Sequence, residues 1–346
     1  MLNKNQLEEI KKYLEKAQNP IFFFDNDPDG LCSFLLLRRW IGRGKGVAIK
    51  SFPDLDAGYF RKVEELNADF VFILDKPVIS KNFLKEIEEH NIPTVWIDHH
   101  NIQTEIPEFV HYYNPCYGEK ESNEPVTYWC YKITEKKDDL WIAVAGCISD
   151  KFVPEFYSEF EKQYPELSIG YKNAFDIFYN AQIGKISKLF SFALKDRTTN
   201  VVSMLRFLVN VKSPYDLLEE NPKNFGIHHR FNQIDGRYQK LLKKASLFGK
   251  NSGKILFFQY GGDLSISSDL SNELSYKFPK KIIVVIYISG VKANISVRGK
   301  KIREPILKSL KGLEGATGGG HEDAVGAQVR VEDIETFKKN FESNLE

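Results

Sequence analysis

The segment Asp25–Gly30 reads DNDPDG and follows directly after the apolar run Ile21–Phe24. The run is typical of a buried strand, and the three carboxylates after it occupy alternate positions, Asp25, Asp27 and Asp29. Like charges that crowd at a strand end repel one another, and their removal from water is costly. A multivalent cation commonly stabilises such a cluster, so the segment indicates a metal site at the edge of a sheet.

Acidic residues and histidines follow three further apolar runs. They are Asp75 after residues 70–74, the triplet Asp98, His99 and His100 after residues 94–97, and Asp150 after residues 142–148. Ligands bind at the carboxyl ends of strands in open α/β sheets, and histidine is a common transition-metal ligand. We therefore expect these side chains to meet the first cluster and to bind hard divalent cations such as Mg²⁺, Mn²⁺ or Ca²⁺.

Two other kinds of site share parts of the DNDPDG pattern. An EF-hand loop also contains DxDxDG, but its twelfth position falls on Leu36 instead of a glutamate, and a predicted strand precedes it. Haloacid-dehalogenase-type phosphatases place a nucleophilic aspartate after an apolar strand in a DxDx(T/V) pattern. Asp29 stands where Thr or Val belongs in that pattern, which leaves this phosphatase type as an alternative.

The apolar runs predict an α/β fold whose N-terminal part, residues 1–150, alternates helices and strands. This alternation predicts a parallel sheet with helices on both faces, which we expect to be the metal-binding domain. The expected strands are 20–24, 47–52, 70–74 and 94–97, and the expected helices are 6–17, 31–41, 58–67, 80–90, 125–134 and 139–149.

The rest of the chain divides into a helical part and a second mixed part. Residues 151–250 predict a helical insertion and connector that ends in a long charged helix over 221–249. Residues 251–346 return to strands and predict a smaller C-terminal α/β domain with a mixed sheet. Its expected strands are 254–260, 281–289 and 292–297, its expected helices are 268–278 and 332–344, and a glycine-rich turn is expected at 318–320.

Bulk properties narrow the class of protein. A chain of 346 residues is expected to form more than one domain, and no apolar run approaches the ~20 residues that span a bilayer. The four cysteines have no CxxC spacing, which favours reduced thiols and a cytoplasmic location without membrane contact. The net charge of +1 argues against broad duplex binding, yet it allows a locally basic site for a short or single-stranded nucleic acid.

Taken together, the motifs resemble the DHH phosphoesterase family with its DHH-associated C-terminal domain. The residues that carry the resemblance are the DxDG of 27–30, the Asp75 motif, the DHH triplet 98–100, Ser149-Asp150, and the GGGH segment 318–321. Arg298 resembles the substrate-binding arginine of the C-terminal domain. The helical middle, 151–250, lies outside any matched motif.

The resemblance implies a role for each matched residue. Asp25, Asp27 and Asp75 would hold one metal ion, and Asp75 would bridge to a second ion held by Asp29, His99 and Asp150. His100 would contact the scissile phosphate, and Asp98 would support the neighbouring histidines. The residues that would grip a phosphate or the end of the substrate are Arg298, Gly318, Gly319, Gly320 and His321. Family members usually carry His where this chain has Asp25, which makes the site more anionic.

By the same resemblance, we expect two divalent cations, Mn²⁺ or Mg²⁺, with Mn²⁺ preferred. The leading hypothesis is a RecJ-like or nanoRNase-like exonuclease that hydrolyses single-stranded DNA or RNA, or short oligonucleotides. One alternative is a phosphatase of nucleotide bisphosphates or cyclic dinucleotides. Another is a non-catalytic scaffold that works with replication or repair proteins, which the unusual Asp25 motivates.

Overall fold

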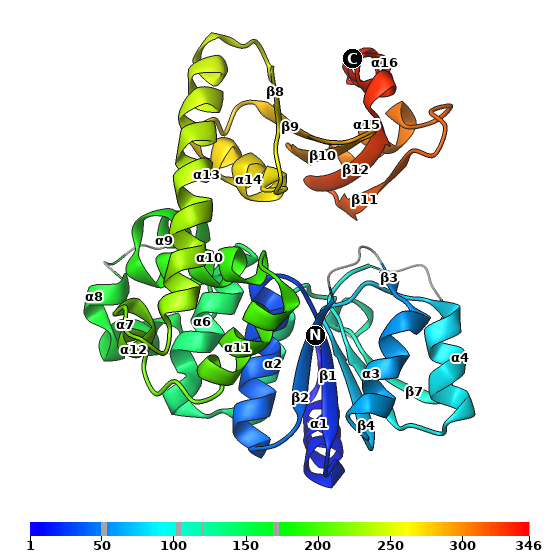
Figure 1. The fold of residues 1–346 in the computed structure, drawn as a ribbon, viewed down its shortest axis with the longest axis vertical. Coiled ribbons are helices and arrows are strands. Elements are labelled where there is room, and N and C mark those ends of the chain that lie inside the picture. Colours follow the sequence, from blue (N-terminus) through cyan, green and yellow to red (C-terminus); the bar gives the residue numbers. More distant parts are fainter. Residues whose placement is uncertain (50–53, 102–104, 119–120, 169, 171–172, 346) are drawn as a thin grey trace. The chain divides into compact units, whose positions relative to one another are not determined.

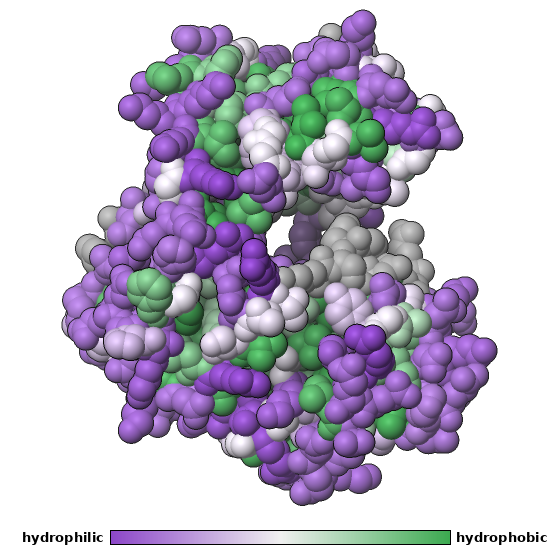
Figure 2. Space-filling view, in the orientation of Figure 1, coloured by the Kyte–Doolittle hydropathy of each residue, from purple (hydrophilic) through white to green (hydrophobic). Residues whose placement is uncertain are grey.

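The computed structural model describes residues 1–49, 54–101, 105–118, 121–168, 170 and 173–345 (Figure 1). The chain forms two compact units, Met1–Phe231 and Asn232–Glu346. Hydrophilic side chains make up most of the visible surface of each unit in Figure 2. Among the described residues, no helix has both the length and the apolar character needed to cross a membrane.

The first unit is built on five parallel strands in the order β2-β1-β4-β6-β7. Their bounds are Pro20–Asp25 for β1, Lys45–Ile49 for β2, Phe70–Leu74 for β4, Thr94–Ile97 for β6 and Val110–Tyr113 for β7. A separate parallel pair joins β3, Asp54–Leu55, to β5, Val78–Ile79. The strand order reverses between β1 and β4, and such a reversal opens a crevice at the carboxyl ends of the strands.

Apolar side chains on both faces of this sheet are buried, as expected for a parallel sheet covered on two sides. On one face, Phe23 and Ile73 pack into a cluster with Phe83 of α4 (Lys81–Glu89). On the other face, Phe24 stacks on Phe34 of α2 (Pro28–Ile41), with ring centroids 5.1 Å apart. The predicted two-sided α/β layer is therefore confirmed.

Helices make up the rest of the first unit (Figure 1). Before residue 151 they are α1 (Lys4–Lys16), η1 (Ala57–Tyr59), α3 (Phe60–Glu65), η2 (Pro115–Tyr117), α5 (Val126–Thr134), η3 (Lys137–Asp139) and α6 (Leu140–Ser149). After it they are α7 (Tyr157–Gln163), α8 (Pro165–Ser168), α9 (Ala174–Asn180), α10 (Gln182–Leu194), α11 (Thr198–Leu208) and α12 (Pro214–Leu218). The long helix α13 (Phe225–Asn251) begins in this unit and continues into the second.

The second unit contains a mixed sheet in the order β11-β12-β10-β9-β8, in which only the β8–β9 pair is parallel. The strands are β8 (Ile255–Gly261), β9 (Ile282–Ser289), β10 (Lys292–Arg298), β11 (Thr317–His321) and β12 (Ala324–Arg330). The helices are α14 (Ser267–Lys277), α15 (Arg303–Ser309), η4 (Val331–Asp333) and α16 (Ile334–Ser343). The predicted mixed sheet is confirmed, and Gly290 lies in the turn between β9 and β10 with φ 59°.

Three local expectations differ from the structure. Helix α2 begins at Pro28 instead of residue 31, because proline is favoured in the first helical turn and Asp27 caps it. The expected glycine-rich turn at 318–320 is instead part of strand β11, which pairs with β12. Strand β7 has no counterpart among the expected strands, since its VHYY sequence has no clear alternation. The end of the strand expected over 47–52 lies outside the described residues.

Candidate metal centre

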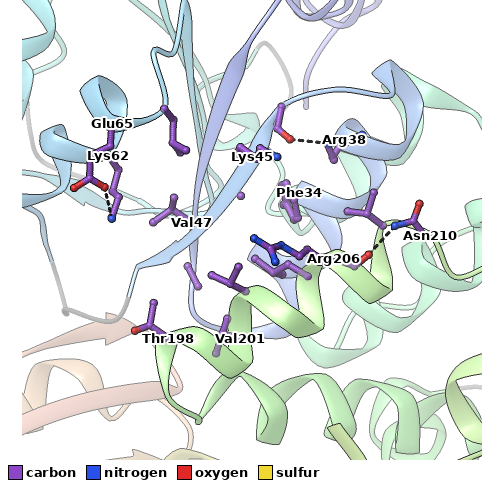
Figure 3. A pocket seen from close by; sticks show the side chains of 17 residues that line it. Phe34, Arg38, Lys45, Val47, Lys62, Glu65, Thr198, Val201, Arg206 and Asn210 are labelled. Atoms are coloured by element: carbon purple, nitrogen blue, oxygen red, sulfur yellow. Dashed lines mark hydrogen bonds and ion pairs between the residues drawn. The ribbon is translucent and has the colours of Figure 1, made fainter. Parts of the chain in front are cut away.

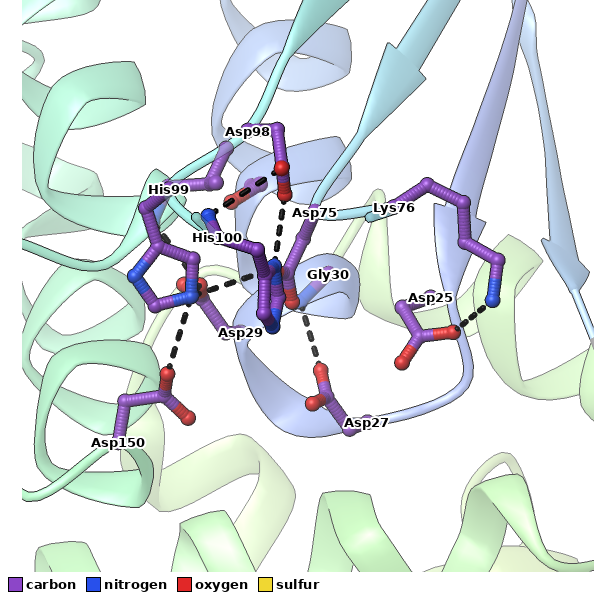
Figure 4. Close-up of polar contacts among 12 residues, drawn as sticks. Asp25, Asp27, Asp29, Gly30, Asp75, Lys76, Asp98, His99, His100 and Asp150 are labelled. Atoms are coloured by element: carbon purple, nitrogen blue, oxygen red, sulfur yellow. Dashed lines mark hydrogen bonds and ion pairs between the residues drawn. The ribbon is translucent and has the colours of Figure 1, made fainter. Parts of the chain in front are cut away.

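The register of the parallel sheet brings three aspartates to one edge. Phe24 pairs with Leu74, and Leu74 pairs with Ile97. The residue that follows each of these partners is an aspartate: Asp25, Asp75 and Asp98 respectively. The three apolar runs therefore end at the same level, and the predicted acidic motifs lie side by side (Figure 4).

The start of α2 places the other two aspartates of the DNDPDG segment. The Asp27 carboxylate accepts the N–H of Gly30 at 2.9 Å and caps the helix, whereas Asp29 lies in its first turn. The alternate positions of the three carboxylates therefore do not belong to one extended segment, since strand β1 ends at Asp25 and α2 begins at Pro28. A Cβ on Gly30 would lie 2.5 Å from the backbone oxygen of Asp25, so only glycine allows this close approach.

A second helix fixes the orientation of the Asp29 side chain. Oδ2 of Asp29 accepts the N–H of Val126 at 2.9 Å, and Oδ1 accepts the N–H of Thr127 at 2.8 Å. These N–H groups belong to the first turn of α5, where backbone donors lack partners within the helix. The Thr127 hydroxyl also donates to the backbone oxygen of Asp29. The N-terminus of α5 thus holds a buried carboxylate at the sheet edge.

His99 lies at the centre of the cluster. Its Nε2 atom is 3.3 Å from Asp75 Oδ1, 3.5 Å from Asp150 Oδ2 and 3.9 Å from Asp29 Oδ2. Its other ring nitrogen, Nδ1, is 3.3 Å from the backbone oxygen of Asn123. A carbonyl at Nδ1 favours a proton on that atom and leaves the Nε2 lone pair directed at the carboxylates, the form in which histidine binds metals.

Asp75 has an unusual backbone and an unsatisfied side chain. Its φ of 58° lies in the left-handed region, which aspartate enters more readily than most residues. Its buried Oδ1 atom has no hydrogen-bond donor among the described residues, although His99 Nε2 is nearby. Burial, followed by the charges of Asp29, Asp27 and the other neighbouring carboxylates, raises the pKa of Asp75 well above its ordinary value.

The same forces act on the first acidic segment. Burial, then the Asp150 charge, raises the pKa of Asp29 to about 6, although His99 and Thr127 oppose the shift. Burial, then the charges of Asp25 and Asp150, raises the pKa of Asp27. These carboxylates have raised pKa values because burial and like charges disfavour their ionised forms. A divalent cation at this position would favour the ionised forms and would give the unsatisfied Asp75 oxygen a partner. The donor set of carboxylate oxygens and one imidazole suits Mn²⁺ or Mg²⁺.

Among the residues that the structure describes, two groups of His, Asp, Glu or Cys side chains have ligand atoms within 4.8 Å of one another. One group is Asp75, His99 and His100, and the other is Asp29, His99 and Asp150. Asp150 reaches the cluster from the C-terminal end of α6, and its side chain is 28 % exposed. The expected ligands therefore come from strands β1, β4 and β6 and from helices α2 and α6.

His100 lies against Asp98, which follows strand β6. Nδ1 of His100 is 2.8 Å from Asp98 Oδ1, and the His100 N–H donates to Asp98 Oδ2. Burial alone would lower the pKa of His100, but the Asp98 charge, the hydrogen bond and the charges of Asp150 and Asp25 raise it to about 9. Asn114, just after β7, donates to the backbone oxygen of His100 and further fixes this residue.

Sequence reasoning missed Lys76. Its side chain is fully buried, and its Nζ lies 2.6 Å from Asp25 Oδ1 (Figure 4). Neither of the two ligand groups contains Asp25 or Asp27, within the part of the chain that the structure describes. The available signal was the ILDKP sequence, in which a lysine follows the strand-end Asp75 directly.

In the second unit, the structure brings Arg298 and His321 to one end of the sheet. Both residues are in register with Ala324 of β12, one on each neighbouring strand. Arg298 donates from Nε to Asn272 Oδ1 at 2.6 Å and from a terminal nitrogen to Ser268 Oγ, so α14 orients its guanidinium. His321 is exposed, and Gly320 beside it has φ 134°, which only glycine readily adopts.

A cavity of about 380 Å³ lies elsewhere in the first unit, between strand β2 and helix α11 (Figure 3). Its lining is largely apolar, with Phe34, Val47 and Val201 among the contributors, and it also includes Arg38 and Arg206. The described residues that line it include none of the acidic residues or histidines of the metal centre.

Comparisons with known proteins agree with this architecture. Residues 251–346 match the family model of the DHHA1 domain. No curated protein matches the chain significantly in sequence. RecJ from Thermus thermophilus, solved with Mn²⁺, superposes with a TM-score of 0.69 at 13% identity, over 98% of this chain and 54% of that one. The chain thus spans about half the length of that RecJ.

Two further solved structures share the fold. The DHH domain of a member of a family of ribosomal proteins has a TM-score of 0.71 at 14% identity, over 99% of this chain and 90% of that chain. A pGpG-specific phosphodiesterase from Vibrio cholerae has a TM-score of 0.50 at 13% identity, over 95% and 99% of the two chains. The chain accordingly shares the fold of these solved structures, and its residues 251–346 match the DHHA1 domain.

Proposed function

We propose that this protein is a metal-dependent phosphodiester hydrolase that acts as a RecJ-like exonuclease on single-stranded DNA or RNA. The observation that carries the proposal is the convergence of Asp29, Asp75 and Asp150 on Nε2 of His99, at 3.3 to 3.9 Å. Carboxylates and an imidazole at the switch point of a parallel sheet are suited to phosphoryl chemistry with a divalent cation.

In this proposal, Asp29, Asp75, His99 and Asp150 hold the cation. When bound, Mn²⁺ or Mg²⁺ would lower the pKa of water at the site and would offset negative charge on the phosphoryl oxygens. The protein keeps its ligands in place through the α5 N–H groups on Asp29 and the Asn123 carbonyl on His99. These fixed partners lessen the reorganisation needed when substrate arrives.

His100 has a separate role in the proposal. The Asp98 carboxylate, with neighbouring charges, keeps the imidazole protonated at neutral pH, since it raises the pKa of His100 to about 9 against the effect of burial. Nδ1 of His100 then donates to Asp98, and we assign to the Nε2 N–H the contact with a phosphate oxygen of the substrate. This proton-bearing ring stabilises charge that develops on the scissile phosphate.

The second unit supplies substrate binding. Arg298, His321 and the backbone of Gly318–Gly320 are proposed to bind a phosphate or the terminus of a nucleic acid. Support comes from the shared register of Arg298 and His321 across β12 and from the anchoring of Arg298 by α14. Arginine is suited to bidentate phosphate binding, and strand-paired glycines let a backbone approach closely.

The proposal is tested by digestion of end-labelled single-stranded DNA and RNA of several lengths with Mn²⁺, with Mg²⁺ and with chelator. Stepwise, metal-dependent shortening that is lost in Asp75→Asn supports it, and the labelled end that survives gives the direction. Untouched oligonucleotides of every length overturn the exonuclease proposal. The matched control is Asp263→Asn, because the Asp263 side chain is 91 % exposed and belongs to the second unit.

A dinucleotide phosphodiesterase is the second candidate. It is favoured by the likeness to the pGpG-specific enzyme, which this chain matches over 99% of that enzyme's length. The two candidates differ in how the rate depends on substrate length. Turnover that is rapid for a dinucleotide and falls steeply with each added nucleotide favours the second candidate, whereas turnover sustained on long strands favours the exonuclease.

A further inference from the structure

A buried lysine lies beside the acidic cluster of the first unit. Lys76 follows Asp75 at the end of β4, and its side chain is 0 % exposed. Its ammonium contacts Oδ1 of Asp25 at 2.6 Å, and its backbone oxygen accepts the indole N–H of Trp96. A buried ammonium is costly unless a carboxylate pairs with it, so Asp25 and Lys76 form a unit that cannot easily exchange partners.

The other potential ligands concentrate on a single nitrogen. Oxygens of Asp29, Asp75 and Asp150 all lie within 3.9 Å of Nε2 of His99. An imidazole nitrogen has one lone pair and ligates one metal ion at a time. The two ligand groups that share His99 therefore describe one cation position and not two.

Two carboxylates are left for a second cation, Asp25 and Asp27. Asp25 already contacts the Lys76 ammonium, so Asp27 would be the only one of the two without a neighbouring ammonium among the described residues. A second dication at Asp25 would have to share that carboxylate with a fixed positive charge only 2.6 Å from one of its oxygens. Coulombic repulsion between the dication and the buried ammonium disfavours this arrangement.

We propose that the centre binds one divalent cation, at Asp29, Asp75, His99 and Asp150, and that the Lys76 ammonium takes the place of a second cation at Asp25. The inference rests on the proposed function, because it assumes that the cluster binds metal. It replaces the expectation of two cations with one cation and one protein charge. Lys76 is a charge-balancing residue that positions Asp25.

The test counts metal ions directly. The metal-free chain of 346 residues is titrated with Mn²⁺ by calorimetry, and bound manganese is measured by elemental analysis. Electron paramagnetic resonance reports whether the bound ions are magnetically coupled. The expected result is one Mn²⁺ per chain with an uncoupled signal. Two tightly bound ions with the coupled signal of a pair about 3.5–4 Å apart would overturn the inference.

Variants of Lys76 sharpen the result. Lys76→Met keeps the length of the side chain but removes its charge, and combined with Asp25→His it is expected to bind a second Mn²⁺. Lys76→Arg keeps the charge and is expected to bind one ion. Failure of the double variant to gain an ion counts against the inference. Should the double variant not fold, the count for the unmodified chain decides.

Hydrolysis measured on the same samples separates this inference from the proposed function. Two ions with hydrolysis overturn the inference alone. One ion without hydrolysis of any oligonucleotide supports the inference on metal number and overturns the proposed function. No bound manganese at all overturns both, and the Asp75→Asn variant sets the background for weak surface binding.

Discussion

Oδ1 of Asp98 lies 2.8 Å from Nδ1 of His100, in a pair that follows strand β6. The pair opposes the effect of burial and raises the pKa of His100 to about 9. Because a raised histidine pKa means that the charged form persists to higher pH, His100 stays protonated through the neutral range. The proposed function needs this charged form at the scissile phosphate.

We predict that Asp98→Asn shifts the alkaline limb of the pH–rate profile to lower pH. In the unmodified protein, the rate should fall as pH rises through about 9, when His100 loses its proton. Without the Asp98 charge, burial lowers the pKa of the His100 ring. The rate of hydrolysis should then begin to decrease at a pH about one or more units lower. An unchanged alkaline limb, with Asp263→Asn as the control, would show that His100 does not act as a cation.

The metal-free protein should become less stable as pH rises from about 4 to 6. The pKa of Asp29 is raised to about 6 from an ordinary 3.8, chiefly by burial, and the pKa values of Asp27 and Asp75 are raised in the same direction. Carboxyls with raised folded-state pKa values stabilise the fold fully below their unfolded pKa, and this contribution is lost as pH rises through the folded value.

Urea unfolding with chelator at pH 4.5, 6 and 7.5 measures this loss. Because other carboxylates of the chain titrate too, the comparison is with Asp75→Asn, which lacks one of the buried charges. Across this pH range, the free energy of unfolding of the unmodified chain should fall by roughly 1 to 3 kcal/mol more than that of the variant. Mn²⁺ at 100 times its Kd should restore about 2.7 kcal/mol at pH 7.5 to the unmodified chain. A difference of opposite sign would mean that the cluster is stable when ionised without metal.

The strand-end aspartates could be found from sequence because one signal determines both strand and site. In a parallel sheet, apolar runs such as Phe70–Leu74 and Thr94–Ile97 are in register, so the polar residues after them meet at one edge. The parallel sheet and the mixed C-terminal sheet follow from the same kind of pattern. Sequence periodicity records these relationships because they are local or repeat along each strand.

Other parts of the site depend on contacts that no local pattern records. Asp29 is bonded to Val126 and Thr127, which are 97 and 98 residues away, and this pairing arises only when α2 packs against α5. The burial of Lys76 against Asp25 likewise depends on the pairing of β1 with β4. The early start of α2 did have a signal, since Pro28 follows a capping aspartate.

Asp75→Asn should lower the rate of hydrolysis by about 100-fold or more, equivalent to about 2.7 kcal/mol of transition-state stabilisation. The substitution removes one of the negative charges that surround His99 and would bind the cation. It also replaces a carboxylate whose Oδ1 has no hydrogen-bond donor among the described residues. Asparagine is preferred to alanine because Asp75 has φ 58°, which asparagine tolerates.

Calorimetric titration with Mn²⁺ should show weaker binding for Asp75→Asn, and the melting temperature without metal should not fall. Near-normal turnover by a variant with normal metal binding would remove Asp75 from the proposed centre. A large drop in the metal-free melting temperature would instead assign the effect to folding.

His321→Ala should raise the KM for an oligonucleotide about tenfold, equivalent to about 1.4 kcal/mol of binding, and leave Mn²⁺ binding unchanged. The reason is that His321 belongs to the second unit, at the end of β11 in register with Ala324, whereas the residues of the proposed metal centre belong to the first unit. Thr317→Ala at the exposed start of the same strand is the control. An unchanged KM, or a matched loss of metal affinity, would contradict the assigned role.

Gly30→Ala should destabilise the protein by about 1 to 3 kcal/mol and weaken Mn²⁺ binding. A Cβ at this position would lie 2.5 Å from the backbone oxygen of Asp25 and 2.7 Å from its backbone nitrogen. Backbone atoms cannot rotate away as a side chain does, so the start of α2 must move from the end of β1. Asp29 directly precedes Gly30, and Asp27 accepts the Gly30 N–H, so both carboxylates would move with it.

The matched control is Gly236→Ala in helix α13, where an added Cβ meets nothing within 4 Å. Alanine there should be neutral or stabilising by up to about 1 kcal/mol, because it restricts the unfolded chain and favours helix. Urea unfolding and Mn²⁺ titration of both variants decide the point. Of these two glycines, Gly30 alone has backbone atoms within reach of the added methyl group. Equal effects of the two substitutions would therefore mean that the close approach at Gly30 does not hold the acidic segment in place.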